Sequence, residues 1–244
     1  MNRAHLIKQA LAILLITGSL AACKKETVSQ KAHCRMSKAV IGGLGEFNYY
    51  YTADGKIDSI VSPDATGSGL VETFSYNGNI ITRLDKYAGV FRMRSTITVN
   101  ANGQATNVRK NLNEAGTNWQ NIAYDYSGTE LIKATYTNPP PNRDSTIYTY
   151  TWNNGNIVSM RSPAGFSALE YYTDKPVQDG DYLIFQTKVY EGYETFKTKN
   201  IIKSGSGING SVINYTYDAD GKILSLNSLA GTQFVVITYQ YECN

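Results

Sequence analysis

The feature that most constrains the fold of this chain is a phrase repeated along it: two aromatic residues at positions i and i+2, a short turn of Asp, Asn and Gly, and then aliphatic residues. Clear copies begin at Tyr49, Phe74 and Tyr215, and weaker copies at Tyr124 and Tyr148. Repeats of this kind are typical of folds in which each unit buries the apolar face of its neighbour. The repeat therefore constrains architecture more tightly than it constrains activity.

Each phrase predicts an antiparallel hairpin. Side chains at i and i+2 share one face of a strand, and the intervening residues are polar, as in a half-buried sheet. The turns supply the positive-φ residues that tight hairpins require. After the turns, aliphatic residues recur at a spacing of three, in Ile57 and Ile60, Ile157 and Met160, and Ile223 and Leu226. A regular strand would place such pairs on opposite faces, so we predict a β-bulge or strong coiling in the second strand of each of these hairpins.

We predict an all-β fold: an antiparallel meander of repeated hairpins that forms a curved sheet, an open barrel or a two-layer wrap. Two segments depart from the repeat. Tyr171–Pro176 and then residues 177–200 read as an excursion from the sheet, with one short helix or a wide loop. Asn138–Asn142 holds three prolines, which cannot donate ladder hydrogen bonds and predict a stiff turn.

The N-terminus predicts export and lipidation. Arg3 and Lys8 precede an apolar stretch, residues 11–16, that is too short for a membrane-spanning helix. Small residues then lead into Cys23, which resembles a lipoprotein cleavage box; a plain signal peptide with an incidental cysteine is the alternative. The predicted organisation is a lipoprotein signal peptide at 1–22, a lipid-anchored tether at 23–33 and a single β domain at 34–244. Acylated Cys23 would anchor the protein to a membrane without spanning it.

The predicted removal of the signal peptide affects the net charge of the mature protein, and the residue after Cys23 bears on its location. Removal of residues 1–22 takes away Arg3 and Lys8 and leaves 21 basic residues against 20 acidic ones. A nearly neutral domain argues against a nucleic-acid partner, because phosphate contacts demand a strongly basic face. Lys24 follows the cysteine where many inner-membrane lipoproteins carry Asp. We therefore expect a lipid-anchored protein of the outer membrane, on its periplasmic face or at the cell surface.

Two cysteines remain, Cys34 near the start of the domain and Cys243 near its end. An even pair in an exported chain suggests a disulfide, with two unrelated free thiols as the alternative. Closing a loop of about 200 residues would contribute roughly 5 kcal/mol in the chain-entropy model. If the bridge forms, the first and last strands must lie side by side.

The chain resembles cell-envelope lipoproteins of Bacteroidota whose function is unknown and whose domain carries Tyr-x-Tyr-Asp-x-x-Gly phrases related to YD repeats. The resemblance extends over most of residues 34–244. It is carried by Tyr215–Gly221, Tyr171–Pro176 and residues 199–203, while the copies at Phe74 and Val99 are degenerate. The resemblance implies a fold and a location. It provides no catalytic residues to transfer.

Catalytic motifs are scarce. His33 is the one histidine after the signal peptide, and no nucleophile elbow, Walker loop or complete dinucleotide fingerprint occurs. We therefore expect no enzyme activity, no cofactor and no metal. A hydrolase acting on glycans through paired carboxylates is the alternative to solvated surface charges. Its candidate carboxylates are Glu72, Asp125, Glu170, Glu191 and Glu194.

The chain contains 19 Tyr but 7 Phe, a surplus of rings with a polar tip. Such rings either pack in the core and in cross-strand ladders or stack on a ligand. The candidate ligand-binding residues are Trp119, Trp152, Tyr190 and Tyr193. The leading hypothesis is a non-catalytic envelope lipoprotein that binds a glycan, a polymer or a partner protein. A structural role in assembly of the envelope remains a further alternative.

Overall fold

The computed structural model describes residues 34–63, 69–141, 145–189, 191–205, 211–230 and 233–243 of the 244-residue chain. The chain divides into two units after His33, and the described residues belong to the second, Cys34–Asn244. The predicted signal peptide at 1–22, the tether at 23–33 with Cys23, and Tyr190 lie outside the described residues.

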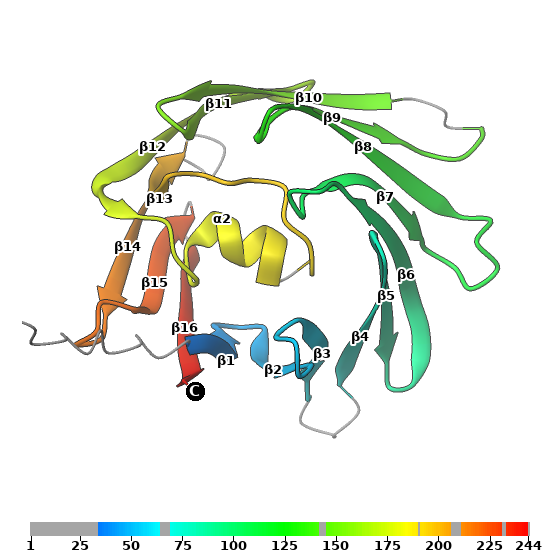
Figure 1. Ribbon diagram of the computed structural model, residues 1–244, viewed down its shortest axis with the longest axis horizontal. Helices are drawn as coiled ribbons and strands as arrows, with labels where there is room; N and C mark the ends of the chain where they lie inside the picture. The colour runs from blue at the N-terminus through cyan, green and yellow to red at the C-terminus, as the bar shows by residue number, and fades with distance from the viewer. Residues whose placement is uncertain are drawn as a thin grey trace, which may run out of the picture. The chain divides into compact units, whose positions relative to one another are not determined.

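Sixteen antiparallel strands form a closed barrel in which each strand pairs with its neighbours in sequence and β1 pairs with β16 (Figure 1). The strands are β1 (Cys34–Ile41), β2 (Gly45–Tyr51), β3 (Ile57–Ser62), β4 (Leu70–Asn77), β5 (Ile80–Tyr87), β6 (Val90–Val99), β7 (Ala105–Asn111), β8 (Trp119–Ser127), β9 (Glu130–Thr137), β10 (Ser145–Asn153), β11 (Asn156–Ser162), β12 (Gly165–Pro176), β13 (Asn200–Gly205), β14 (Ser211–Tyr217), β15 (Ile223–Ala230) and β16 (Gln233–Cys243). The predicted all-β meander is confirmed. The sheet closes completely, so its first and last strands pair with each other.

The repeated phrases form the hairpins that they predict. A bulge is present in the three hairpins whose aliphatic residues recur at a spacing of three, whereas the β4–β5 hairpin pairs without a register shift. In the β2–β3 hairpin, Tyr50 pairs with Ser59 and Tyr51 with Ile57, which leaves Asp58 as the extra residue. The β10–β11 and β14–β15 hairpins shift register at the equivalent position. The bulge turns Ile57 back toward the inside of the barrel, where it packs with the core that contains buried Ile60.

A disulfide joins Cys34 to Cys243 across the β1–β16 seam. These two residues are register partners, so the pairing of the first and last strands brings the two sulfurs together. The disulfide predicted from cysteine number and position is thus present, and the alternative of two free thiols is wrong. The bridge closes a span of 209 residues.

Residues 177–199 leave the wall after β12, cross the inside of the barrel and return at β13 (Figure 1). We call them the inner segment. They contain α2 (Tyr182–Ile184), which runs directly into a π-helical turn, η1 (Phe185–Val189). The predicted excursion therefore exists and holds one short helix, but Tyr171–Pro176 belong to β12.

The inner segment is tied to the wall by buried polar contacts. Asp181, with 0% exposure, caps α2 by accepting hydrogen bonds from the backbone of Leu183 and Ile184. It also accepts a hydrogen bond of 2.9 Å from the backbone of Ile202 in β13. Further along, the backbone of Ala105 at the start of β7 donates to the carbonyl of Glu194 at 2.9 Å. Both halves of the segment are thus fixed to strands.

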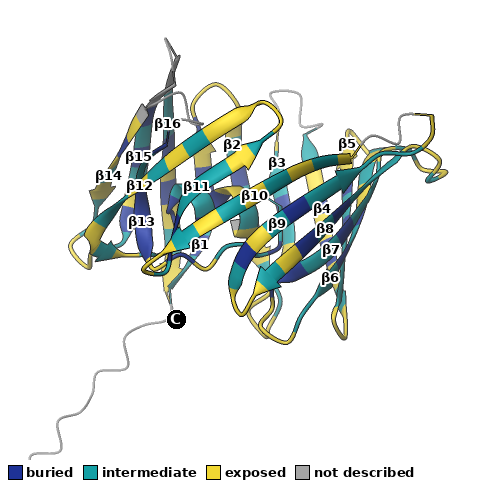
Figure 2. Ribbon diagram, turned by 90° about the horizontal axis from the view of Figure 1, so that it is seen from above, coloured by how far each residue is buried: buried dark blue, intermediate teal, exposed yellow. Residues whose placement is uncertain are grey.

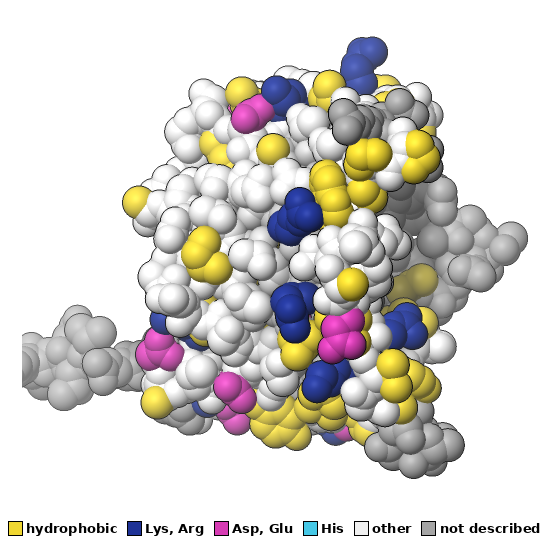
Figure 3. Space-filling view, turned by 90° about the vertical axis from the view of Figure 1, so that its right-hand side faces the viewer, with side chains coloured by type: hydrophobic (Ala, Val, Ile, Leu, Met, Phe, Trp, Pro, Cys, Tyr) yellow, Lys and Arg dark blue, Asp and Glu magenta, His cyan; other side chains and the backbone are white. Residues whose placement is uncertain are grey.

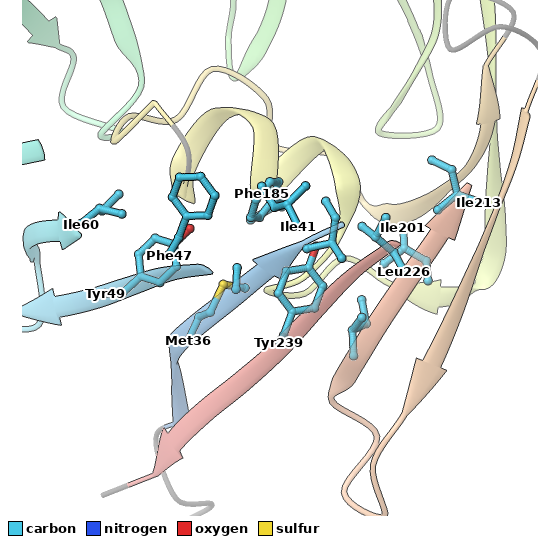
Figure 4. Packing of buried hydrophobic residues seen from close by; sticks show 14 of the residues in the cluster. Met36, Ile41, Phe47, Tyr49, Ile60, Phe185, Ile201, Ile213, Leu226 and Tyr239 are labelled. Carbon is cyan, nitrogen blue, oxygen red and sulfur yellow. The ribbon is translucent and has the colours of Figure 1, made fainter. Parts of the chain in front are cut away.

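Apolar side chains fill the barrel around the inner segment. One core gathers side chains from the β1–β4 and β13–β16 region around Phe185 of η1, as Figure 4 shows. A second core lies between β6 and β9 and receives Tyr193 from the inner segment. Figure 2 shows buried and exposed positions alternating along the strands. Exposed positions include many polar residues, such as Thr73, Thr149, Thr216, Thr238 and Gln240.

Candidate functional site

Trp119 lies on the outer wall of the barrel, at the first residue of β8. Its register partner on β7 is Asn111, and the guanidinium carbon of Arg109 lies 4.1 Å from the centre of its ring. Val108 and Ile122 occupy the alternate face of the same two strands and are buried in the second core, with 0% and 1% exposure. The alternation places Arg109, Asn111 and Trp119 on the outer face. Trp119 is half-buried there, so part of its ring is accessible.

A groove of about 340 Å³ opens on the wall at the β5–β6 hairpin. At the tip of this hairpin Val90 is 68% exposed. Beside it, the guanidinium carbon of Arg94 lies 5.9 Å from the centre of the Phe91 ring. The lining residues are Leu84, Lys86, Gly89, Val90, Phe91, Arg94 and Glu114. The groove therefore combines an apolar surface with two cations and one carboxylate.

Strand register joins this groove to Trp119. Leu84 on β5 pairs with Arg94 on β6, and Arg94 pairs with Asn111 on β7. Asn111 in turn pairs with Trp119 on β8. Because neighbouring strands lie about 4.8 Å apart, the row from Leu84 to Trp119 spans about 14 Å. We call the following residues the outer-wall site: Leu84, Lys86, Phe91, Arg94, Arg109, Asn111 and Trp119.

Figure 3 views the molecule from the side where β5, β6 and β7 lie in Figure 1. On this face Lys and Arg side chains are set among hydrophobic ones, with some Asp and Glu side chains beside them, and much of the remaining surface is made of other side chains and backbone. Basic and apolar groups are thus interspersed on the wall that carries the outer-wall site.

Two other candidate residues lie inside the barrel. Trp152 is half-buried against the second core, and its indole Nε1 donates a hydrogen bond of 2.7 Å to the carbonyl of Leu131. Tyr193 is 6% exposed and its hydroxyl lies 3.3 Å from that of Tyr124. Burial raises the pKa of Tyr193. The structure thus separates Trp119 on the outer wall from Trp152 and Tyr193 in the interior, and ligand binding by these residues stays a prediction.

A buried charge cluster inside the barrel links the wall to the inner segment. Arg83 on β5 lies 2.8 Å from a carboxylate oxygen of Glu72 on β4 and 2.7 Å from one of Asp85. Glu191 of the inner segment lies 3.7 Å from Arg83 and 3.0 Å from Lys110 on β7. Burial, followed by the nearby carboxylates of Asp85 and Glu191, raises the pKa of Glu72 to about 8 although Arg83 opposes the shift. The arrangement favours a protonated Glu72 in the neutral range.

The five carboxylates considered for glycan hydrolysis are not gathered at one place. Glu72 and Glu191 meet at Arg83, but Glu72 is 2% exposed, too little to contact a polysaccharide. Asp125 pairs with Lys133 at 2.7 Å, and Glu170 lies 3.3 Å from Lys203. Glu194 belongs to the inner segment and lies 3.9 Å from Lys197.

A metal-ligand cluster and a membrane-spanning helix are both absent from the described residues. No group of three His, Cys, Asp or Glu side chains in them is placed to hold a metal ion. None of the helices in the same ranges is long and apolar enough to cross a membrane.

The sequence singles out Trp119 by residue type but not Phe91, Arg94 and Lys86, which lie with it in the outer-wall site. The missed residues lie in a hairpin that lacks the repeated aromatic phrase, with Ala88-Gly89 at its turn. A signal was present in Phe91-Arg92-Met93-Arg94, where an aromatic residue stands near two arginines. The register that brings Arg94 into line with Trp119 depends on strand pairing and could not be read from spacing.

Comparison with solved structures identifies the barrel. A porin-like protein from Bacteroides uniformis superposes with a TM-score of 0.62 at 15% identity, over 85% of this chain and 96% of that one. A porin-like protein from Bacteroides vulgatus gives a TM-score of 0.57 at 16% identity, over 85% of this chain and 98% of that one. The chain shares their barrel fold. No protein-family model and no curated protein matches the sequence.

Proposed function

We propose that this protein is a non-enzymatic, lipid-anchored barrel of the cell envelope that binds a glycan on its outer wall. The observation that carries the proposal is the outer-wall site. It places an accessible Trp119 and the Phe91 ring on one wall, with a groove of about 340 Å³ and an amide side chain, Asn111, along the same row. Aromatic faces that stack on sugar rings, flanked by hydrogen-bonding groups, are the chemistry that glycan recognition requires.

The distribution of polarity supports a barrel wall that faces water. Membrane-spanning barrels carry an apolar band on the outside and a polar interior. Here the exposed strand positions mix polar residues such as Thr73 and Thr149 with apolar ones such as Ile132 and Ile147, whereas the interior holds two apolar cores and the inner segment. The bilayer would then be reached through acylated Cys23. The fold shared with Bacteroides proteins agrees with an envelope location in a Bacteroidota organism.

The test is binding of the full chain, purified in detergent, to a glycan array and to soluble polysaccharides by affinity electrophoresis. We expect Trp119→Ala to weaken binding about fivefold, since stacking by one aromatic residue is worth about 1 kcal/mol. Tyr50→Ala is the matched control, because Tyr50 is a 52% exposed aromatic residue on β2, away from the outer-wall site.

Three outcomes would overturn the proposal. If Trp119→Ala and Tyr50→Ala bind the glycan equally well, the outer-wall site does not recognise it. Release of new reducing ends from a bound polysaccharide would favour the hydrolase. Capture of envelope proteins with no glycan binding would favour an assembly partner.

A further inference from the structure

The cations of the outer-wall site have no carboxylate partners in the part of the chain that the structure describes. Lys86, Arg94 and Arg109 form no ion pair with any residue that the structure describes, and Glu114 is the one carboxylate that lines the groove. Elsewhere on the barrel, some basic side chains of the strands are paired, since Lys38, Lys133 and Lys203 lie within 2.9, 2.7 and 3.3 Å of a carboxylate. Arg92, Arg161 and Lys175 also form no ion pair with a described residue. The outer-wall site thus carries an excess of positive charge on a domain that is close to neutral.

Each of the two arginines lies over an aromatic ring, and Arg109 Nε also donates a hydrogen bond of 3.4 Å to Oδ1 of Asn111. Arg94 lies over Phe91 at 5.9 Å and Arg109 over Trp119 at 4.1 Å, measured from the guanidinium carbon to the ring centre. A guanidinium placed against a ring retains the N–H groups in its own plane, which can grip a carboxylate, sulfate or phosphate with two hydrogen bonds. Each ring–arginine pair therefore offers an apolar face beside an anion contact.

The pairs repeat across the strands. Arg94 on β6 pairs with Asn111 on β7, and Arg109 lies two residues before Asn111. The Cα atoms of the two arginines are thus diagonal neighbours, about 7–8 Å apart. A ligand that follows the row from Leu84 to Trp119 would meet one arginine after the other. This arrangement suits a chain with an anion on successive units.

From these observations, and resting on the proposed function, we infer that the glycan is an acidic polysaccharide whose carboxylate, sulfate or phosphate groups bind Arg94 and Arg109 while its sugar rings stack on Phe91 and Trp119. A peptide is disfavoured because the closed barrel offers no free strand edge to which a peptide strand could add. Lys86 contributes further positive charge at the groove end of the row.

The inference is tested with acidic polysaccharides and neutral forms of the same backbone. The probes are polygalacturonate against its fully methyl-esterified form, and chondroitin sulfate against chemically desulfated, carboxyl-reduced chondroitin. The full chain in detergent should bind at least one acidic probe at least tenfold more tightly than its neutral form. This preference should weaken as salt rises, because exposed charges are screened.

The variant Arg94→Gln/Arg109→Gln should lose that preference by tenfold or more. Lys133→Gln/Lys203→Gln removes the same amount of charge from ion-paired wall positions and should retain it. Circular dichroism melting curves check that both double variants remain folded.

The possible results distinguish failure of the acidic-ligand inference from failure of the proposed glycan binding. Equal, Trp119-dependent binding of acidic and neutral forms would overturn the acidic ligand and leave the proposed glycan function standing. If both double variants lose the preference for the acidic probe equally, overall charge explains the preference, and the proposed binding to Arg94 and Arg109 is overturned. Binding of poly-glutamate without binding of any polysaccharide would overturn both, in favour of an acidic peptide. Failure of every acidic probe to bind would overturn the inference.

Discussion

At the scale of single residues, Glu72 shows how burial changes a side chain's chemistry. One of its oxygens contacts Arg83, while among the described residues the other, Oε2, has no hydrogen-bond partner. The pKa of Glu72 rises from an ordinary 4.5 to about 8, chiefly through burial. The folded state therefore binds a proton that the unfolded state releases. This contribution to stability is complete below about pH 4.5 and is lost as pH rises through 8.

We expect Glu72→Gln, which cannot ionise, to reduce the fall in the free energy of unfolding between pH 5 and pH 9. Urea denaturation at several pH values measures that fall. The charged groups around Glu72, namely Arg83, Asp85 and Glu191, remain in the variant, as does Lys110 beside Glu191. Glu170→Gln is the control, since the Glu170 side chain is 64% exposed and lies 3.3 Å from Lys203. If wild type and Glu72→Gln show the same pH dependence, Glu72 does not hold the proton.

At the scale of elements, the inner segment packs against the wall too closely to admit one more carbon. Gly192 has φ of +79°, and a Cβ at this position would overlap the Phe74 ring on β4. Gly55, in the turn between β2 and β3, has φ of +82° with nothing within 4 Å of its Cβ position. Replacing either glycine with Ala would therefore strain the backbone, but only at Gly192 would the new Cβ also collide with a side chain.

We expect Gly192→Ala to lower the free energy of unfolding by about 1–3 kcal/mol more than Gly55→Ala does, which is the usual cost of overpacking. Hydrogen exchange should rise across residues 177–199 in Gly192→Ala and stay unchanged there in Gly55→Ala. Equal effects of the two substitutions would show that the inner segment can shift away from β4 and accommodate the added carbon.

Elements differ in how far the sequence determines them. The hairpins and their bulges could be predicted, because the aromatic pairs, the Gly turns and the spacing of Ile57 and Ile60 are local signals. The location of the inner segment could not be predicted, since residues 177–199 carry no local mark of being inside a barrel; their place depends on distant partners such as Ala105 and Ile202. For the same reason, only part of the outer-wall site could be predicted from the sequence. Trp119 stands out by residue type, whereas its alignment with Arg94 requires two correct strand pairings, β6 with β7 and β7 with β8.

At the scale of the whole molecule, a closed barrel requires its ends to meet, and the Cys34–Cys243 bridge fixes that closure covalently. The chain-entropy model assigns roughly 5 kcal/mol to a loop of about 200 residues. The β1–β16 hydrogen bonds remain when the bridge is removed, so we expect Cys34→Ser/Cys243→Ser to fold but to unfold at lower urea. Reductant should shift the wild-type midpoint to that of the double variant and leave the variant unchanged. Cys23→Ser, which keeps the bridge, should respond to reductant as wild type does. If reductant does not change the urea midpoint of the wild type, strand pairing alone holds β1 and β16 together. The bridge then adds nothing measurable to the closure of the barrel.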